Sequence, residues 1–338
     1  MSASKNRQIR LASRPHGWVQ ADNFDVTESE VGEPADGEIL VRNIVMSVDP
    51  YMRGRMNDTK SYVPPFQIGE VLQAGVVGQV HASRNDDFAE GDYVTGMLGW
   101  ENFSISNGEG LRKVANTDVP LSYYLGILGM PGMTAWVGLT EIANLKEKDS
   151  VFVSAASGAV GSVVGQIAKI YGCHVAGCAG SDEKVELLQS EFGFDSVFNY
   201  KTSKSLPKTI AEACPGGIDV NFENVGGEIF EAALWNMRPF GRIAMCGMIA
   251  NYNDEELQPG PRGMMTIIGN RLTIRGFIVS DLPDACAAFV PKAANWIAEG
   301  KLKYRETIAE GVENAPTAFI DMLQGKNVGK QIVRLGDD

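Results

Sequence analysis

The sequence predicts an α/β protein in which a β-rich domain accompanies a doubly wound parallel sheet. Two different sequence patterns along its 338 residues predict this fold class. Residues 1–125 contain short apolar and β-branched runs separated by Gly, Pro and Asp, a pattern typical of strands joined by turns. From about Pro131 to Gly300, apolar strands alternate with helical patterns, as they do in parallel sheets built from βαβ units.

The β-rich part is expected to be completed by the C-terminal tail. Strands are predicted in the first part at Glu38–Val45, Gly75–Val80 and Gly91–Gly96. The tail is predicted to form a helix near Ala315–Leu323 and a last strand at Gln331–Leu335. We therefore expect residues 1–125 and 301–338 to form one domain and residues 126–300 to form the other.

The second domain is predicted as a series of strands with helices between them. Its strands are expected at Val151–Val153, His174–Ala179, Asp195–Tyr200, Ile218–Asn224, Arg242–Gly247 and Leu272–Val279. Helices are expected after Gly158, after Ser181, from Glu228 and over Pro283–Gly300. The first of these helices has a one-sided apolar pattern and a plausible stop at Gly172.

The most informative segment is the turn between the first strand and the first helix of this series. It reads Ala156-x-Gly158-x-x-Gly161, the dinucleotide fingerprint of a Rossmann unit with Ala in place of its first Gly, and Gly165 adds a small residue where the helix packs on the sheet. Small residues here let backbone amides and a helix N-terminus approach a pyrophosphate. A βαβ unit without a ligand is the alternative interpretation of this segment.

The end of the following strand indicates which dinucleotide binds. NAD sites usually place Asp or Glu there, to bind the ribose 2′-hydroxyl. Here the strand ends in Gly180-Ser181-Asp182-Glu183-Lys184, so its tip is small and neutral. Ser181 is expected to cap the next helix, and Lys184 to reach back towards a 2′-phosphate. Asp182 and Glu183 are interpreted as first-turn acids that complement the helix dipole. This pattern favours NADP over NAD.

Composition excludes several other classes of protein. The net charge of −12 argues against nucleic-acid and anionic-membrane partners. No apolar run reaches membrane-spanning length, and the first seven residues lack the apolar core of a signal peptide. The five cysteines are scattered and odd in number, which fits a reducing cytoplasm.

The same composition gives no support to metal or triad chemistry. There is no C-x-x-C pair, and His16, His81 and His174 are far apart in sequence, whereas zinc ligands are usually clustered. There is no G-x-S-x-G elbow that would suggest a Ser-His-Asp hydrolase. We therefore expect no metal site. In open α/β sheets ligands bind at the carboxyl ends of the strands, so the loops there are the candidate site.

Several motifs resemble one family over nearly the whole chain. The segment Ser47–Met56, with Asp49-Pro50-Tyr51-Met52, and the segment Gly129–Ala135 are similar to signatures of the zinc-independent medium-chain dehydrogenase/reductases. This branch contains prostaglandin reductases, leukotriene hydroxydehydrogenases, plant double-bond reductases and bacterial curcumin reductase. Further motifs match in order, namely Gly158–Gly165, Gly180–Lys184, Phe198–Lys201, Asn224–Gly227, Cys246-Gly247, Tyr252-Asn253, Gly276–Val279 and Gly325–Lys330. The C-terminal third is most similar to the bacterial curcumin-reductase type. The resemblance implies a GroES-like β-rich catalytic domain beside the Rossmann domain.

The resemblance also implies a set of NADPH contacts. Ala159, Val160, Gly161 and Ser162 would hold the pyrophosphate, and Lys184 and Tyr200 would flank the 2′-phosphate. Asn224 would lie near the ribose, and Asn327 would reach the cofactor from the other domain. The strand-end loop would contribute Cys246, Gly247, Met248, Ile249, Ala250, Asn251 and Tyr252, and Phe277, Ile278 and Val279 would lie at the nicotinamide.

The implied reaction is metal-free reduction of a carbon–carbon double bond conjugated to a carbonyl group. Zinc-dependent relatives carry a Gly-His-Glu motif, but here Ile68-Gly69-Glu70 has no histidine, and the four-cysteine zinc lobe is absent. Hydride goes to the β-carbon, the enolate oxygen needs hydrogen-bond donors, and the α-carbon takes a proton. Tyr51 and Tyr252 are the candidate proton donors, with water as the alternative.

Three further questions stay open at this point. A zinc-free NADPH-dependent quinone reductase and a non-catalytic NADPH-binding protein are the alternative functions. Some plant and mammalian members have a tyrosine where this chain has Gly269, so the substrate pocket is wider or Gly269 marks a turn. Family members often pair their nucleotide domains edge to edge, so a homodimer through Leu272–Val279 is expected, with a small-molecule enone or enal as substrate.

Overall fold

The computed structural model describes residues 5–114, 118–256 and 258–336. These residues form two compact units. The first contains residues 1–125, 306–327 and 331–338, and the second contains residues 126–305 and 328–330. All the predicted site residues lie in the described ranges.

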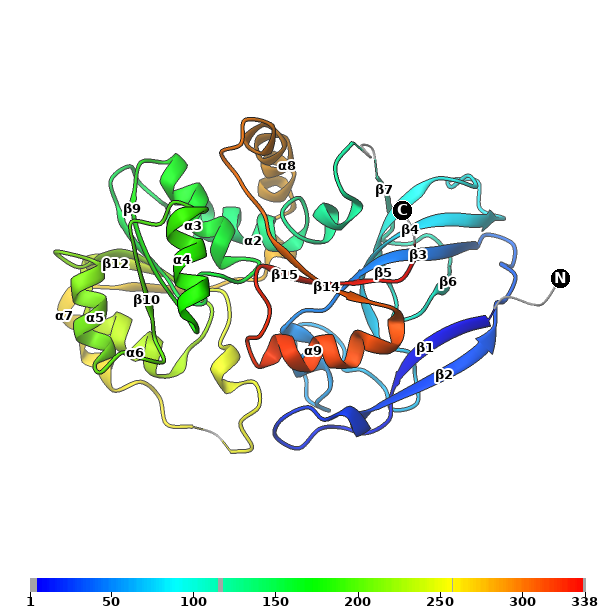
Figure 1. Cartoon of the computed structure of the whole chain (residues 1–338), viewed down its shortest axis with the longest axis horizontal. Coiled ribbons are helices and arrows are strands. Elements are labelled where there is room, and N and C mark those ends of the chain that lie inside the picture. The colour runs from blue at the N-terminus through cyan, green and yellow to red at the C-terminus, as the bar shows by residue number, and fades with distance from the viewer. Residues whose placement is uncertain (1–4, 115–117, 257, 337–338) are drawn as a thin grey trace. The chain divides into compact units, whose positions relative to one another are not determined.

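The first unit is built on a seven-stranded sheet (Figure 1). Its strands run in the order β14 (Glu306–Glu310), β15 (Lys330–Arg334), β3 (Ile39–Ser47), β4 (Gln73–Ser83), β5 (Tyr93–Gly99) and β7 (Arg112–Lys113), and β6 (Phe103–Ser106) also pairs with β3. A separate hairpin joins β1 (Lys5–Leu11) to β2 (Phe24–Glu30). β15 pairs antiparallel with β3, so the chain's last strand is part of this sheet.

Aromatic rings fix the C-terminal helix in this unit. Phe319 of α9 (Ala315–Leu323) meets Trp100 edge to face at 6.0 Å between ring centroids, and Trp100 stacks on Phe24 at 6.1 Å. All three side chains are buried. Aromatic pairs of this geometry add to the free energy gained from burial.

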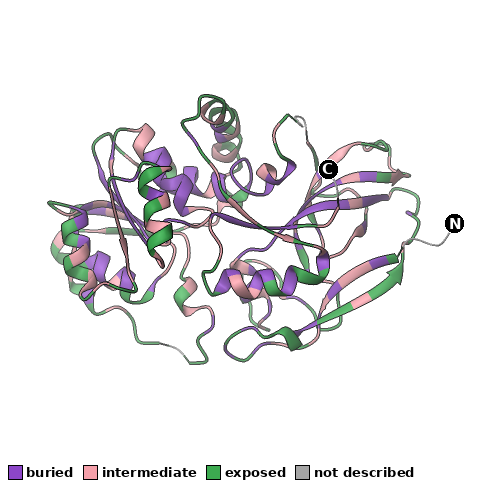
Figure 2. Cartoon of the chain, viewed as in Figure 1, coloured by how far each residue is buried: buried purple, intermediate pink, exposed green. Residues whose placement is uncertain are grey.

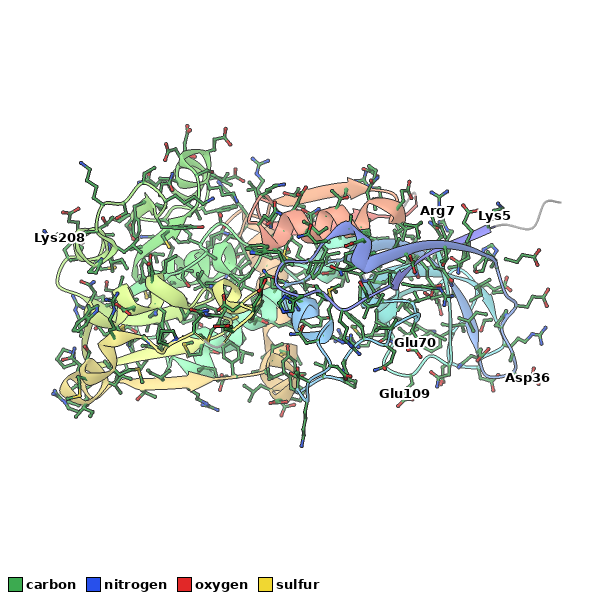
Figure 3. The ribbon with its side chains drawn as sticks, turned by 90° about the horizontal axis from the view of Figure 1, so that it is seen from below. Lys5, Arg7, Asp36, Glu70, Glu109 and Lys208 are labelled. Carbon is green, nitrogen blue, oxygen red and sulfur yellow. The ribbon has the colours of Figure 1, made fainter. Side chains whose placement is uncertain are left out.

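Acidic side chains lie at the surface of the unit, and Figure 3 labels the exposed residues Asp36, Glu70 and Glu109.

The second unit is built on a six-stranded parallel sheet. Its order is β10 (Ser196–Asn199), β9 (His174–Ala179), β8 (Ser150–Val153), β11 (Ile218–Glu223), β12 (Met237–Met245) and β13 (Thr273–Gly276). The order reverses at β8 and β11. Because crossovers between parallel strands are right-handed, α3 (Gly161–Ile170) and α4 (Asp182–Ser190) cover one face and α6 (Gly227–Trp235) the other. This is the predicted doubly wound sheet.

The remaining helices of the second unit complete the two layers. α2 (Met130–Val137) packs beside α3, and α5 (Leu206–Ala213) packs beside α6 (Figure 1). α7 (Met265–Asn270) leads to β13, and α8 (Pro283–Ala298) packs on α2. Strands β8, β9 and β11 are almost wholly buried, whereas every residue of β13 is exposed (Figure 2). The central strands therefore hold the core, and β13 is a solvent-facing edge.

Several predicted boundaries were wrong by a few residues. β5 begins at Tyr93 rather than Gly91, because Gly91 has φ +89° and Asp92 closes a turn by accepting from the Ala89 amide at 2.9 Å. β13 ends at Gly276, after which the chain turns towards a short 3-10 helix at Val279–Asp281. β12 begins at Met237, before the expected Arg242, across an irregular segment where Phe240 has φ +64°.

Candidate functional site

The carboxyl ends of β8, β9, β11 and β12 lie along one edge of the parallel sheet, where the strand order reverses. Such switch points form crevices in doubly wound sheets, because neighbouring connections leave in opposite directions. Most of the predicted cofactor residues follow these strand ends. The site is described below from β8 outwards, within the second unit.

The turn from β8 to α3 is built for close backbone approach. Ala155 adopts φ +47°, and its carbonyl oxygen accepts from the Gly158 amide at 3.0 Å. A Cβ placed on Gly161 would collide with that carbonyl oxygen, and one on Gly165 would collide with the Phe194 ring. Glycine is therefore required at both positions, for the turn and for helix–sheet packing, as the fingerprint predicts.

Two observations show that this turn fits an anion. The amides at the start of α3, around Ala159, Val160 and Gly161, have no acceptor within the helix, and the helix has no side-chain cap. The Ser162 hydroxyl is buried and finds no hydrogen-bond partner among the described residues. A dinucleotide pyrophosphate would satisfy these donors and complement the positive end of the helix.

The tip of β9 has the features expected of a 2′-phosphate site. The Ser181 hydroxyl caps α4 by accepting from the Lys184 amide at 3.4 Å, as predicted. A Cβ placed on Gly180 would lie 3.3 Å from the Tyr200 hydroxyl and 3.3 Å from Lys201 Cε. Burial lowers the pKa of the half-buried Lys184, and the charge of Lys201 lowers it further. The two lysines therefore lie close enough to interact, and both would gain from a dianion.

Asp182 and Glu183, the acidic residues next to this tip, lie in the first turn of α4. The Asn199 amide donates to the Asp182 carboxylate at 2.8 Å, and Asp182 and Glu183 are exposed in the first turn of α4. Both positions agree with their interpretation as acids that complement the helix dipole.

The β11 end places Asn224 against β8. Its backbone amide donates to the Ser154 hydroxyl at 2.8 Å, and its side-chain amide donates to the Ser154 carbonyl oxygen at 2.8 Å. The buried Glu223 carboxylate accepts from Ser154 and from the loop amides of Val225 and Gly226. The Asn224 side chain is thus oriented by the protein before any ligand arrives.

The loop after β12 folds onto the loop after β11. The Cys246 and Gly247 amides donate to the Glu223 carbonyl oxygen at 2.9 and 3.1 Å, and the Ala250 amide donates to the Val225 carbonyl oxygen at 2.9 Å. The Tyr252 hydroxyl accepts from the Met248 amide at 3.4 Å. Residues 246–252, which the resemblance assigns to the cofactor, therefore form one hydrogen-bonded segment.

Phe277 follows β13 and packs on the same sheet. Its ring meets Phe222 of β11 edge to face at 6.4 Å between centroids. A Cβ placed on Gly138 would collide with the Phe222 ring and would lie 2.9 Å from Phe277 Cζ. Gly138 opens a short π-helical turn, Gly138–Ile142, and its missing side chain makes room for both rings.

A C-terminal segment of three residues, Val328–Lys330, packs against the turn from β8 to α3. The Gly329 amide donates to the Ser157 carbonyl oxygen at 2.8 Å, and Gly329 forms a parallel bridge with Gly158. Gly329 has φ +66°, and a Cβ there would collide with the Arg305 carbonyl oxygen. Asn327, the predicted contact, immediately precedes this segment and belongs to the first unit.

Tyr51 lies in the first unit, at the first position of α1 (Tyr51–Arg55). Burial raises the pKa of its hydroxyl above the ordinary value, and the nearby Asp49 raises it further. Arg55 acts in the opposite direction through its charge and a hydrogen bond to Tyr51. Asp49 itself is buried and accepts a short hydrogen bond from the Ser47 hydroxyl. Tyr51 is therefore fully protonated at neutral pH.

Among the described residues, no group of three or more His, Cys, Asp or Glu side chains lies close enough together to hold a metal ion. Glu70, which stands where zinc-dependent relatives keep a glutamate, is exposed (Figure 3). None of the helices in the described ranges combines the length and the apolar character that crossing a bilayer requires.

Comparison with known families matches both parts of the chain. Residues 7–114 match the N-terminal domain of oxidoreductase family, and residues 159–297 match the zinc-binding dehydrogenase family. The NADPH-dependent curcumin reductase of Escherichia coli is 43% identical over 99% of this chain and 98% of its own length. The chain belongs to the medium-chain dehydrogenase/reductases, in the branch that holds this enzyme.

Other members of this branch of the medium-chain reductases cover the chain equally well. A 2-alkenal reductase (NADP⁺-dependent) of Nicotiana tabacum is 43% identical over 97% of both chains. The crystal structure of CurA in complex with NADPH from Vibrio vulnificus superposes with a TM-score of 0.93, at 44% identity over 98% of this chain and 100% of that one. The predicted family and fold class are confirmed.

Three groups of residues at the site of this medium-chain reductase could not be assigned a role from the sequence. Lys201 lies near Lys184, but in the sequence it is only the last residue of the Phe198–Lys201 motif. The Val328–Lys330 segment and the buried Glu223 were likewise not assigned. A glutamate directly after Phe222, at the end of a predicted strand and before Asn224, is the signal in the sequence that points to Glu223.

Proposed function

We propose that this chain is an NADPH-dependent oxidoreductase that reduces the carbon–carbon double bond of α,β-unsaturated ketones and aldehydes. The observation that carries the cofactor preference is the tip of β9, where Tyr200 and Lys201 lie beside Gly180 and Lys184 lies near enough to Lys201 for their charges to interact. A 2′-phosphate would be bound there by two cations and a hydroxyl. The substrate class is supported by the relatives at 43% identity, which are named as curcumin and 2-alkenal reductases.

The residues proposed to bind NADPH divide by the part of the cofactor that they hold. The proposed pyrophosphate contacts are Ala159, Val160, Gly161 and Ser162, the 2′-phosphate contacts are Lys184, Tyr200 and Lys201, and the remaining contacts are Asn224, residues 246–252, Phe277, Ile278, Val279 and Asn327. The orphaned Ser162 hydroxyl and the collision that any side chain at Gly161 would cause support the first group.

When bound, reduced nicotinamide supplies a hydride to the β-carbon of the substrate, and no metal is proposed to take part. The electron pair of the double bond moves onto the carbonyl oxygen, where an enolate develops that hydrogen-bond donors stabilise. A proton then reaches the α-carbon. Tyr51 and Tyr252 are the proposed donors, because a phenol stays protonated at neutral pH and still gives up its proton in a transition state.

The experiment that tests this function follows NADPH consumption with a panel of enals, enones and quinones. We expect turnover with enals and enones, with the saturated carbonyl compound as product, and the same rate after treatment with a chelator. Much faster turnover of quinones would instead identify a quinone reductase. Tight binding of NADPH without turnover of any acceptor would identify a non-catalytic binding protein. Loss of activity with the chelator would contradict the metal-free reaction.

We also propose that the protein is a homodimer, paired through β13. All four residues of this edge strand are exposed, and Ile274 and the neighbouring Met265 and Ile268 of α7 expose 36%, 74% and 71% of their surfaces. Exposed apolar edge strands are templates for pairing with another chain, and a second copy would extend the parallel sheet and cover these side chains.

A cytoplasmic location is proposed on the basis of the cysteines. Cys173, Cys178 and Cys214 are buried as thiols, and burial raises their pKa values to about 11, 12 and 11. Structural thiols of this kind are typical of reducing compartments. Fractionation of cells expressing the chain would test the location, and recovery outside the cytoplasmic fraction would contradict it.

A further inference from the structure

Glu223 is a fully buried acidic residue that the proposed reaction does not use. It is the last residue of β11, in the middle of the parallel sheet, and its exposed fraction is 0%. Burying an ionised carboxylate costs several kcal/mol unless hydrogen bonds and packing compensate. A fully buried glutamate in the middle of the sheet therefore needs a reason.

Four donors surround the carboxylate. Oε1 accepts from the Ser154 hydroxyl at 2.8 Å, from the Val225 amide at 2.8 Å and from the Gly226 amide at 2.9 Å. Oε2 accepts from the Asn221 side-chain amide at 3.1 Å. Burial raises the pKa of the carboxyl, and these hydrogen bonds oppose that effect because all four are made to an acceptor.

Two of these donors belong to the loop that turns from β11 into α6. The Val225 and Gly226 amides meet the same oxygen atom, and Gly226 adopts φ +76°. Ser154, the third donor, accepts from the Asn224 amide at 2.8 Å. The carboxylate thus ties the end of β8 to the loop at residues 224–226 and determines where Asn224 lies.

The loop held by Glu223 in turn holds the second loop. The Ile249 amide donates to the Asn224 carbonyl oxygen at 3.3 Å, and the Ala250 amide donates to the Val225 carbonyl oxygen at 2.9 Å. Cys246 of this second loop lies near the Glu223 side chain. Burial raises the pKa of the Cys246 thiol to about 12, and the electrostatic effect of Glu223 contributes to this rise. Both loops are therefore supported from one buried group.

We propose that Glu223 is a positioning residue for the cofactor, which fixes the loops at residues 224–226 and 246–252 in the arrangement that binds the ribose and nicotinamide half of NADPH. This inference rests on the proposed function, since it concerns how that cofactor is held. The carboxylate does not touch the cofactor in this role. It acts through Asn224 and through the backbone of both loops.

The test measures NADPH affinity directly, by titration calorimetry on the full-length protein, alongside steady-state kinetics with an enone. Glu223→Ala removes the acceptor of four hydrogen bonds, and the Ser154 hydroxyl keeps only the Phe222 carbonyl oxygen at 3.4 Å. We expect the Kd and KM for NADPH to rise about tenfold or more. We expect kcat with both substrates saturating to fall less than about threefold, because the residue does not contact the reacting atoms.

Two further variants separate positioning from general stability. Glu223→Gln keeps one oxygen for the three donors at Oε1. Its amide nitrogen replaces Oε2, which accepts from the Asn221 side-chain amide, so the Asn221 amide must flip for its oxygen, which has no partner among the described residues, to accept from the new amide. We expect it to restore most of the affinity. Ser154→Ala removes only the bridging hydroxyl, so it serves as the test if Glu223→Ala does not fold. We expect it to weaken NADPH binding by about threefold to fivefold.

Asp149→Ala is the matched control. Asp149 is 8% exposed, precedes β8 at the opposite edge of the sheet, and accepts from the Lys146 amide and from Arg242, both at 2.8 Å. We expect this variant to lower the melting temperature without changing the Kd for NADPH.

The outcomes are distinguishable. If the unaltered protein binds NADPH but Glu223→Ala and Ser154→Ala bind it equally well, the positioning role is wrong while the proposed function stands. If the unaltered protein does not bind NADPH, the proposed function fails and this inference fails with it. If Asp149→Ala weakens NADPH binding as much as Glu223→Ala, the effect is one of stability and positioning is again wrong.

Discussion

At the tip of β9, the side chains of Tyr200 and Lys201 lie beside Gly180, and Lys184 lies near Lys201. Lys184 comes from α4, and Tyr200 and Lys201 come from the end of β10, so their meeting depends on β9 and β10 being neighbours in the sheet. The preference for NADP could be predicted from the neutral strand tip and Lys184. Lys201 could not, because sequence does not reveal that the residue after Tyr200 returns to Gly180.

The lysines give a prediction on cofactor preference. Lys184→Ala should raise the KM for NADPH by about tenfold or more and leave that for NADH nearly unchanged, since a charge-assisted contact to phosphate is lost. Lys201→Ala should act in the same direction but less, because Lys201 is more exposed. The exposed Lys208 of α5 is the control, and its replacement by alanine should change neither constant (Figure 3). Equal effects on NADPH and NADH would contradict the phosphate role.

The direction of the Lys184 shift predicts a pH dependence. Its pKa is lowered, so the ammonium group loses its charge at a lower pH than the ordinary value of about 10.4. The affinity for NADPH should therefore fall as the pH rises through this lowered pKa, whereas the affinity for NADH should not follow. Titrations of both cofactors between neutral and alkaline pH check this, and parallel curves for the two cofactors would contradict it.

The two candidate proton donors can be separated by removing one hydroxyl at a time. If a tyrosine protonates the α-carbon, either Tyr51→Phe or Tyr252→Phe should lower kcat by about a hundredfold or more. Because the pKa of Tyr51 is raised, a reaction that depends on Tyr51 should keep its rate up to about pH 10. Near-normal kcat in the double variant would mean that water supplies the proton.

At the scale of elements, the turn from β8 into α3 shows how far a local pattern predicts structure. The fingerprint glycines, the Gly172 stop and the Ser181 cap all act through neighbouring backbone, and each lies where expected. The Val328–Lys330 segment reaches the same turn from more than 150 residues away in sequence. Local patterns in a sequence do not reveal contacts between such distant residues, so this contact could not be predicted.

Alanine at two glycines tests the shape of this turn. Gly161→Ala places a methyl group against the Ala155 carbonyl oxygen, and we expect the shift of α3 to cost about 1–3 kcal/mol and to weaken NADPH binding about tenfold. Gly269→Ala is the matched control, because Gly269 lies in α7 with no atom within 4 Å of an added Cβ. Melting curves and NADPH titrations check both, and tight binding by Gly161→Ala would contradict the proposed pyrophosphate site.

At the scale of the whole molecule, the sequence predicted the parallel sheet better than the β-rich unit. Helices and strands alternate in the second unit, so the spacing of apolar residues in the sequence distinguishes each helix from the neighbouring strands. The first unit has strands such as β1 and β2 whose pairing joins residues 13 to 25 apart in sequence. Most of β2 is exposed, which removes the apolar alternation that marks a strand. Its C-terminal strand pairs with β3 across most of the chain.

The proposed dimer predicts a change of mass on altering β13. We expect the unaltered protein to elute with the mass of two chains in light scattering, and Ile274→Lys to elute as one, because an edge lysine opposes pairing. Ile308→Lys is the control, since Ile308 is an exposed isoleucine on β14, the edge strand of the other sheet. A single-chain mass for the unaltered protein would contradict the dimer.

The return of residues 328–330 to the second unit has a practical consequence for anyone who divides this chain. A fragment ending at Arg305 would contain every strand of the parallel sheet, yet the Ser157 carbonyl oxygen would lose the Gly329 amide that it accepts from. Removing only the residues after Lys330 would spare that hydrogen bond but take away most of β15. Neither cut yields a self-sufficient piece, so truncation is a poor route to an isolated nucleotide-binding module.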